Sequence, residues 1–165
     1  MTKTFADSSF LVSLYQQDAN TEAAVSAMQR LKMSIWISSL VEVELFNALQ
    51  LRVFRKQINR DEATSAHEAV QQDLRDGILV RKGISSAVYE TSAWLSRKHT
   101  AALGTRSLDL IHVATAIVLG AEQICSFDRS QWKLASAEGL AIIPKPTSHA
   151  NTTGRRHPSR ASSKE

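Results

Sequence analysis

Residues 3–15 read KTFADSSFLVSLY, and this stretch decides the fold more than any other part of the chain. Its first four residues form a short extended run, which Asp7 ends and two small hydroxyl residues follow. Large side chains then recur at the three- and four-residue spacing of one helix face, at Phe10, Leu11, Leu14 and Tyr15. The stretch therefore predicts a strand, a turn and a helix, with a carboxylate at the carboxyl end of the strand.

The same order of strand and helix recurs along the chain. We expect strands at residues 3–6, 34–37, 78–80, 123–127 and 140–143. We expect helices at residues 8–15, 20–31, 39–54, 61–76, 85–98, 107–119 and 129–137. Neighbouring parallel strands need long crossover connections, which these helices supply. The sequence therefore predicts an α/β protein of three layers, α/β/α, whose central parallel sheet has four to five strands.

Length and composition limit the class of protein. The chain has 165 residues, of which 43% are hydrophobic and 22% charged, as in an ordinary globular domain. The single cysteine, Cys125, excludes an intramolecular disulfide and a cysteine-based zinc site. No apolar run reaches the roughly 18 residues of a membrane span, and the first residues lack a signal-peptide core. We therefore expect a cytoplasmic protein that does not enter a membrane.

The composition changes sharply after Pro146. Residues 147–165 contain no large apolar side chain, so they cannot bury enough surface to offset the entropy of ordering. We therefore expect one folded domain at residues 1–146 and a basic disordered tail at residues 147–165. The tail carries most of the net charge of +4, through Arg155, Arg156, Arg160 and Lys164 against Glu165.

Carboxylates stand where predicted strands end and predicted helices begin, at Asp7, Asp109 and Asp128. Each has a structural explanation, because aspartate caps helix N-termini and favours the helix dipole in the first turn. The helix at residues 107–119, however, is apolar almost all round, so it leaves Asp109 only the carboxyl edge of the sheet. A parallel sheet would bring all three carboxylates to that edge.

The helix at residues 39–54 offers two further carboxylates. On a helical wheel Glu44 lies between Ala48 and Leu51, inside an apolar arc, whereas Glu42 lies beside Phe46 near the edge of that arc. This pattern favours Glu44 as the residue that faces the sheet edge, without excluding Glu42.

Four carboxylates at one edge repel one another strongly unless a cation compensates them. Oxygen ligands without cysteine suit Mg²⁺ or Mn²⁺ better than zinc. Such an ion keeps several waters and accepts phosphate oxygens as its remaining ligands. The carboxylates therefore predict a divalent-metal site.

Three groups of motifs, in order, carry a family resemblance. The first is residues 5–11, FADSSFL, and the second is residues 38–49, SSLVEVELFNAL. The third begins with residues 108–116, LDLIHVATA, and continues at residues 120–121, 126–128 and 139–140. Together they resemble the PIN domain, specifically the VapC-like toxins of bacterial and archaeal toxin–antitoxin systems, over about residues 3 to 144. The second motif selects Glu44 over Glu42.

The resemblance implies a Mg²⁺- or Mn²⁺-dependent endoribonuclease that is the toxin of a type II, VapBC-like toxin–antitoxin system. One or two metal ions would be held by Asp7, Glu44, Asp109 and Asp128. The carboxylates would be oriented by Ser9, Asn47 and Ser126, although helix capping explains the two serines equally well. The resemblance also implies a homodimer and a cognate antitoxin that silences the enzyme. The alternative function is a non-catalytic, RNA-binding regulatory PIN module.

Other residues have simpler interpretations beside functional ones. The cations Arg52, Arg55, Lys56 and Arg60 would share one face of a continuous helix, either as a solvated face or as a contact for RNA phosphates. In the tail, Arg155 and Arg156 either contact RNA or belong to a dispensable extension. We expect His112 to be half-buried and hydrogen-bonded rather than a metal ligand. Trp36, Trp94 and Trp132 fall at core-like positions, and stacking on RNA bases is the functional alternative.

Overall fold

The computed structural model describes residues 2–145, so the predicted tail at residues 147–165 lies outside the described residues. Five parallel strands form one sheet in the order β3-β2-β1-β4-β5. The strands are β1 (Thr4–Ala6), β2 (Ile35–Ser38), β3 (Leu79–Lys82), β4 (Gln123–Cys125) and β5 (Ala141–Ile143). The predicted α/β class and its parallel sheet of four to five strands are confirmed.

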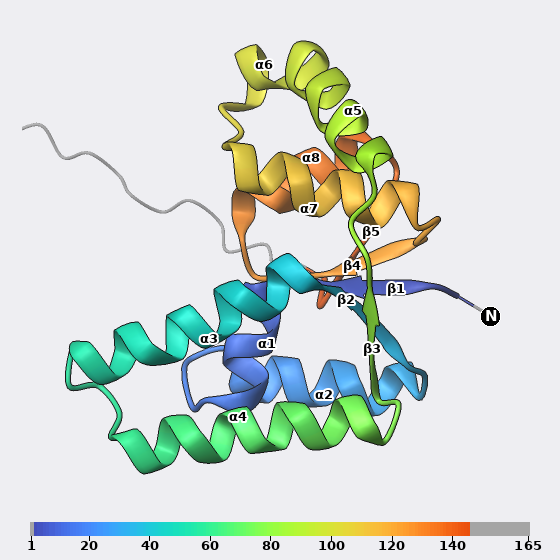
Figure 1. Ribbon diagram of the computed structural model, residues 1–165. Coiled ribbons are helices and arrows are strands. Elements are labelled where there is room, and N and C mark those ends of the chain that lie inside the picture. The colour runs from blue at the N-terminus through green and yellow to red at the C-terminus, as the bar shows by residue number, and fades with distance from the viewer. Residues whose placement is uncertain (1, 146–165) are drawn as a thin grey trace, which may run out of the picture.

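Helices cover both faces of the sheet, which gives the predicted three layers (Figure 1). On one side of the strands lie α1 (Ser8–Tyr15), α2 (Thr21–Leu31), α3 (Ser39–Phe54) and α4 (Arg60–Arg75). On the other side lie α5 (Ser86–Leu95), the π-helical turn η1 (Ser96–Thr100), α6 (Ala101–Leu103), α7 (Ser107–Val118) and α8 (Arg129–Ala137). In Figure 1 the helices α3 and α4 run side by side and project beyond the sheet.

Strand β1 lies at the centre of the sheet and sets the position of the site. Its Phe5 pairs with Trp36 of β2, and its Ala6 pairs with Cys125 of β4. Because the strands are parallel, the residues that follow them emerge at the same edge of the sheet. Asp7 and Ser126 are therefore neighbours in space although 119 positions separate them in sequence.

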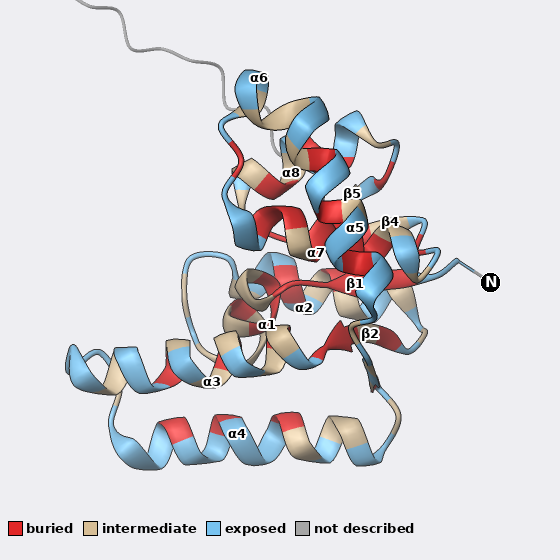
Figure 2. Cartoon of the chain, turned by 45° about the horizontal axis from the view of Figure 1, so that its top comes forward, coloured by how far each residue is buried: buried red, intermediate tan, exposed pale blue. Residues whose placement is uncertain are grey.

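The core surrounds this central strand. Fully buried side chains come from β1, α1, β2, α3 and β4, namely Phe5, Phe10, Ile37, Leu45 and Ile124. Figure 2 shows buried segments along β1 and α7, whereas α4 is largely exposed on its outer side. As predicted, α7 is buried on most sides, with Asp109 at 1% exposure among its apolar neighbours. No helix within residues 2–145 combines the length and apolar character that crossing a bilayer requires.

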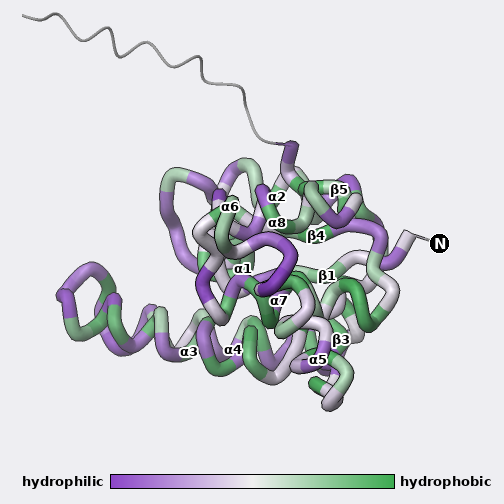
Figure 3. Tube along the Cα trace, turned by 90° about the horizontal axis from the view of Figure 1, so that it is seen from above, coloured by the Kyte–Doolittle hydropathy of each residue, from purple (hydrophilic) through white to green (hydrophobic). Residues whose placement is uncertain are grey.

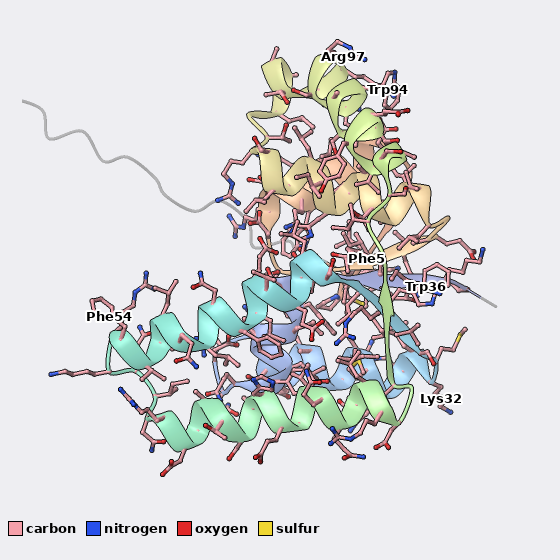
Figure 4. The ribbon with its side chains drawn as sticks, in the orientation of Figure 1. Phe5, Lys32, Trp36, Phe54, Trp94 and Arg97 are labelled. Carbon is pink, nitrogen blue, oxygen red and sulfur yellow. The ribbon has the colours of Figure 1, made fainter. Side chains whose placement is uncertain are left out.

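The predicted helix at residues 85–98 differs from the observed elements in two respects. The α-helix ends at Leu95, and the chain continues as a π-helical turn, in which the backbone hydrogen bonds span five residues instead of four. The core position predicted for Trp94 is wrong: its side chain is 45% exposed and lies beside Lys98, whose Nζ is 4.4 Å from the ring centroid. Figure 4 shows Trp94 and Arg97 at the outer surface, far from Phe5 in the sheet.

The stretch of cations that begins at Arg52 does not form one helix face. Helix α3 ends at Phe54, and Lys56 has a φ of 57°, which breaks the helix before α4 begins at Arg60. Figure 4 shows Phe54 at the projecting end of the α3–α4 pair, and Figure 3 shows hydrophilic and hydrophobic residues alternating there. The expected stripe is therefore divided between a helix, a turn and the start of a second helix.

Two neighbouring residues of α5 provide a test of this packing. Leu95→Ala removes a fully buried side chain and should lower the free energy of unfolding by about 2–5 kcal/mol. Trp94→Ala removes a larger but half-exposed side chain and should cost less than about 1 kcal/mol. Urea denaturation followed by circular dichroism measures both changes. A larger loss for Trp94→Ala would contradict the observed orientation of α5.

Candidate active site at the carboxyl edge of the sheet

Asp7 lies at the end of β1, where it caps helix α1. Its carboxylate accepts hydrogen bonds from the Phe10 N–H (2.9 Å), the Ser126 hydroxyl (2.7 Å) and the Ser9 hydroxyl (2.8 Å). The side chain is fully buried, and this burial raises the pKa of Asp7 above its ordinary value, although the three hydrogen bonds and the nearby His112 oppose the rise. Burial thus makes the ionised form of Asp7 unfavourable, and the hydrogen-bond donors around it offset part of that cost.

The two serines on Asp7 also connect it to the next carboxylate. The Ser9 oxygen accepts from the Phe127 N–H (2.9 Å), and the Ser126 oxygen accepts from the Asp128 N–H (3.0 Å). A change at Ser9 therefore affects both Asp7 and the backbone of Phe127, and a change at Ser126 affects both Asp7 and the backbone of Asp128. The structure places both predicted serines in direct contact with a predicted site carboxylate.

Asp128 and Asp109 share one arginine. Asp128 caps helix α8 with one oxygen, which accepts from the Ser130 N–H (2.7 Å), and its other oxygen accepts from Nη2 of Arg106 (2.8 Å). Asp109 accepts from Nε of Arg106 (3.0 Å), from Nη2 (3.2 Å) and from the backbone N–H of the same residue (3.1 Å). The Arg106 guanidinium therefore bridges the first turns of α7 and α8.

The fourth predicted carboxylate, Glu44, lies on α3 and faces α7. Its Oε2 makes a close polar contact, 2.6 Å, with Nε2 of His112, which is 1% exposed. Glu42 points elsewhere, because both its oxygens accept hydrogen bonds from Arg81 (2.6 and 2.7 Å). That hydrogen bonding lowers the pKa of Glu42. The structure thus separates the two glutamates as the helical wheel suggested.

These groups meet at a pocket of about 290 Å³. Three of the four predicted carboxylates line it, Glu44, Asp109 and Asp128, whereas Asp7 lies behind Ser9. A second hollow of about 400 Å³ adjoins the pocket and shares Ser8, Ser9 and Asp128 with it. The site is therefore open on two sides of the same carboxylate.

Several predicted residues lie away from the pocket. Asn47 is exposed on α3 and is not part of the pocket lining. Arg52 pairs with Asp18 (3.1 Å), which lines the adjoining hollow, whereas Arg55 and Lys56 are exposed near the projecting end of α3. The tail residues Arg155 and Arg156 lie outside the described residues.

The polar residues of the pocket that the sequence prediction did not assign to the site include Arg106 and Gln131. Arg106 stands three positions before Asp109, a spacing at which two side chains can meet around a helix start. Gln131 stands in the first turn of α8, is 5% exposed, and its Oε1 has no hydrogen-bond partner among the described residues. His112 is buried rather than half-buried as predicted, and its Nε2 lies 2.6 Å from Oε2 of Glu44.

The donor atoms of the pocket suit a hard divalent cation. Its carboxylate oxygens, from Glu44, Asp109 and Asp128, are the ligands that Mg²⁺ and Mn²⁺ prefer. Among residues 2–145, no three histidine, cysteine or acidic side chains are arranged closely enough to hold one ion. Arg106 donates hydrogen bonds to oxygens of both Asp109 and Asp128.

The fold and the pocket together define an α/β/α protein with an acidic site at the carboxyl edge of a parallel sheet. A sequence profile of the PIN domain matches residues 4–137, so the chain belongs to the PIN domain family. This finding confirms the family predicted from the ordered motifs. No curated protein matches the chain in a sequence comparison.

Several solved structures share the fold of this chain. VapC20 of Mycobacterium tuberculosis, a toxin that cleaves the sarcin–ricin loop, is 17% identical, with a TM-score of 0.65 over 86% of this chain and 100% of that one. FitAcB of Neisseria gonorrhoeae is 16% identical, with a TM-score of 0.64 over 85% and 96% of the two chains. VapBC2 of Rickettsia felis, bound to a DNA fragment from its promoter, is 15% identical, with a TM-score of 0.62 over 86% and 97%.

The buried charge of Asp7 leads to a prediction about stability. Asp7→Asn keeps a good helix cap and removes a carboxylate whose ionisation is opposed by burial. Because the pKa is raised in the folded state, the cost of ionisation is absent at low pH and grows as the pH rises above the ordinary pKa. We expect the variant to be more stable than the wild type by on the order of 1 kcal/mol at pH 7, with no difference near pH 3.5.

Urea denaturation in EDTA at the two pH values measures this difference. Glu68→Gln, at an exposed position in the middle of α4, is the control and should change stability by less than about 0.5 kcal/mol. A variant Asp7→Asn that is less stable than the wild type at pH 7 would show that the hydrogen bonds outweigh the burial of the charge.

Proposed function

We propose that the protein is a metal-dependent endoribonuclease and the toxin of a type II, VapBC-like toxin–antitoxin system. One observation carries the proposal: in a member of the PIN domain family, Glu44, Asp109 and Asp128 face one pocket, with Asp7 directly behind it. A cluster of carboxylates held by capping and by donor serines is costly to the fold and is what a phosphodiester-cleaving site requires.

Mg²⁺ or Mn²⁺ would be held by Asp7, Glu44, Asp109 and Asp128. When bound, such an ion makes a coordinated water more acidic and offsets the charge that grows on the phosphoryl oxygens. The chain itself orients the carboxylates: Ser9 and Ser126 fix Asp7, and the N-terminus of α8 fixes Asp128. His112, beside Glu44, limits the positions which that carboxylate can adopt.

An RNA strand is the substrate that we propose for this site. The pocket and the adjoining hollow lie on either side of Ser8, Ser9 and Asp128, so a chain of nucleotides can pass through both. Cations at the rim, of which Arg106 is the nearest, can contact its phosphates. RNA contacts by Arg52, Arg55, Lys56, Arg155 and Arg156 stay predictions.

A cognate antitoxin is the proposed partner. One solved structure of this fold is described as a toxin–antitoxin complex from Klebsiella pneumoniae, which supports such a partner for this chain. A homodimer in the cytoplasm belongs to the same proposal.

Two glutamates of one helix provide the sharpest test of the active site. Glu44→Gln removes a carboxylate of the pocket and should lower the rate of RNA cleavage in Mn²⁺ by at least about 100-fold. Glu42→Gln makes the same chemical change two residues away, where Arg81 is the partner, and should leave the rate within about twofold. Asp7→Asn and Asp109→Asn should also abolish cleavage. The measurement is the cleavage of a fluorescent RNA oligonucleotide at equal concentrations of folded protein.

Equal activity of Glu42→Gln and Glu44→Gln would contradict the assignment of the pocket. Binding of RNA by the wild type with no cleavage in either Mg²⁺ or Mn²⁺ would instead favour the non-catalytic, RNA-binding module.

The toxin role predicts an effect on cells. Induced expression of the wild type in a bacterial host should arrest growth, whereas Glu44→Gln at the same expression level should not, because arrest depends on RNA cleavage. Co-expression of the product of an adjacent small reading frame should restore growth if that product is the antitoxin. Growth curves with immunoblots of protein level measure these effects, and normal growth with active wild-type enzyme present would contradict the toxin role.

A further inference from the structure

Arg106 holds a position that bears directly on metal binding. Its guanidinium contacts Asp109 through two nitrogens, at 3.0 and 3.2 Å, and Asp128 through one, at 2.8 Å. Both carboxylates line the pocket, and a metal ion at that site needs oxygens which the guanidinium occupies. The arginine and the ion therefore cannot both hold these atoms in the same way.

Burial explains why the carboxylates need this partner. The Asp109 side chain is 2% exposed, and an isolated carboxylate so deeply buried is strongly unfavourable. Arg106 supplies the opposite charge and a forked set of donors that fits a carboxylate.

The arginine is nevertheless able to leave. Its side chain is 69% exposed, so a rotation into solvent costs it little buried surface. The backbone N–H of Arg106 holds Asp109 independently, at 3.1 Å, so Asp109 stays in place when the guanidinium departs. The contact to Asp128 joins an exposed guanidinium to a carboxylate that is 27% exposed, so water reaches both groups.

Charge favours an exchange. One guanidinium gives a single positive charge to two carboxylates, whereas one divalent ion neutralises both. Removing the arginine without replacement would leave two like charges facing each other at the pocket. Only a cation of at least equal charge can therefore take its place.

We propose that Arg106 is an exchangeable counter-ion of the metal site, which stabilises Asp109 and Asp128 until a divalent metal ion displaces its guanidinium. The inference rests on the proposed function, since it takes the same carboxylates as metal ligands. It adds that the chain itself competes with the metal, so metal affinity is set in part by an arginine.

Calorimetric titration with Mn²⁺ tests the competition without any measurement of activity. The full chain is compared with Arg106→Gln, with Arg106→Lys, and with Arg129→Gln as the control. Arg129 is exposed and directly follows Asp128, so its replacement changes the same charge near the same pocket without removing a carboxylate contact that the structure shows. We expect Arg106→Gln to bind Mn²⁺ about tenfold more tightly than the wild type, because no charge-assisted hydrogen bonds must be broken first. Arg106→Lys should lie between them, and Arg129→Gln within about twofold of the wild type.

Thermal unfolding provides a second readout. In EDTA the melting temperature of Arg106→Gln should fall below that of the wild type, and saturating Mn²⁺ should raise it by more degrees than it raises the wild type. If Arg106→Gln does not fold in EDTA, the comparison of Arg106→Lys with the wild type decides the question in the same way.

The possible results separate the two proposals. Equal or weaker Mn²⁺ binding by Arg106→Gln would overturn the exchange while leaving the metal-dependent nuclease intact. Absence of Mn²⁺ binding by every variant, together with absence of cleavage by the wild type, would overturn the nuclease function and the exchange together.

Discussion

The placement of one buried carboxylate governs the rest of the site. Asp7 follows the central strand and caps the helix that comes next. Its carboxylate accepts hydrogen bonds from two hydroxyl groups, one after β1 and one after β4. Those same hydroxyl oxygens accept the backbone N–H groups of Phe127 and Asp128. The hydrogen bonds around Asp7 therefore hold the ends of β1 and β4 together, and they also fix the backbone of Asp128.

Capping and chemistry are not competing explanations in this fold. Asp128 uses one oxygen to cap α8 and offers the other to the pocket, and Asp109 accepts the Arg106 N–H at the start of α7 while facing the same space. A helix N-terminus holds a carboxylate in a fixed direction at little cost in side-chain entropy. The structural role of each residue is what makes it rigid enough to serve in a site.

Much of this arrangement could be predicted from the sequence, because it follows from periodicity. The alternation of strands and helices predicts a parallel sheet, and the carboxyl edge then collects Asp7 and Asp128. The helical wheel that favours Glu44 over Glu42 needs only the rotation of an α-helix, about 100° per residue. The contacts of Arg106 could not be predicted in this way, because its side chain is long and flexible. One of its partners, Asp128, is 22 positions away in sequence. The exposure of Trp94 also depends on tertiary packing. The helix pattern gives the direction of its side chain around the helix axis, but not how far neighbouring elements cover that face.

The balance of charge around the pocket connects folding with function. Asp109 and Asp128 share a guanidinium, and Glu44 lies beside a buried imidazole, so the chain carries basic groups next to three of its four site carboxylates. A polypeptide with unopposed carboxylates at this edge would lose stability through their repulsion. Groups that relieve this repulsion occupy the same carboxylate oxygens that a metal ion would contact. The stability of the fold and the binding of a metal ion therefore depend on the same few atoms. We expect a substitution that favours one of them to disfavour the other.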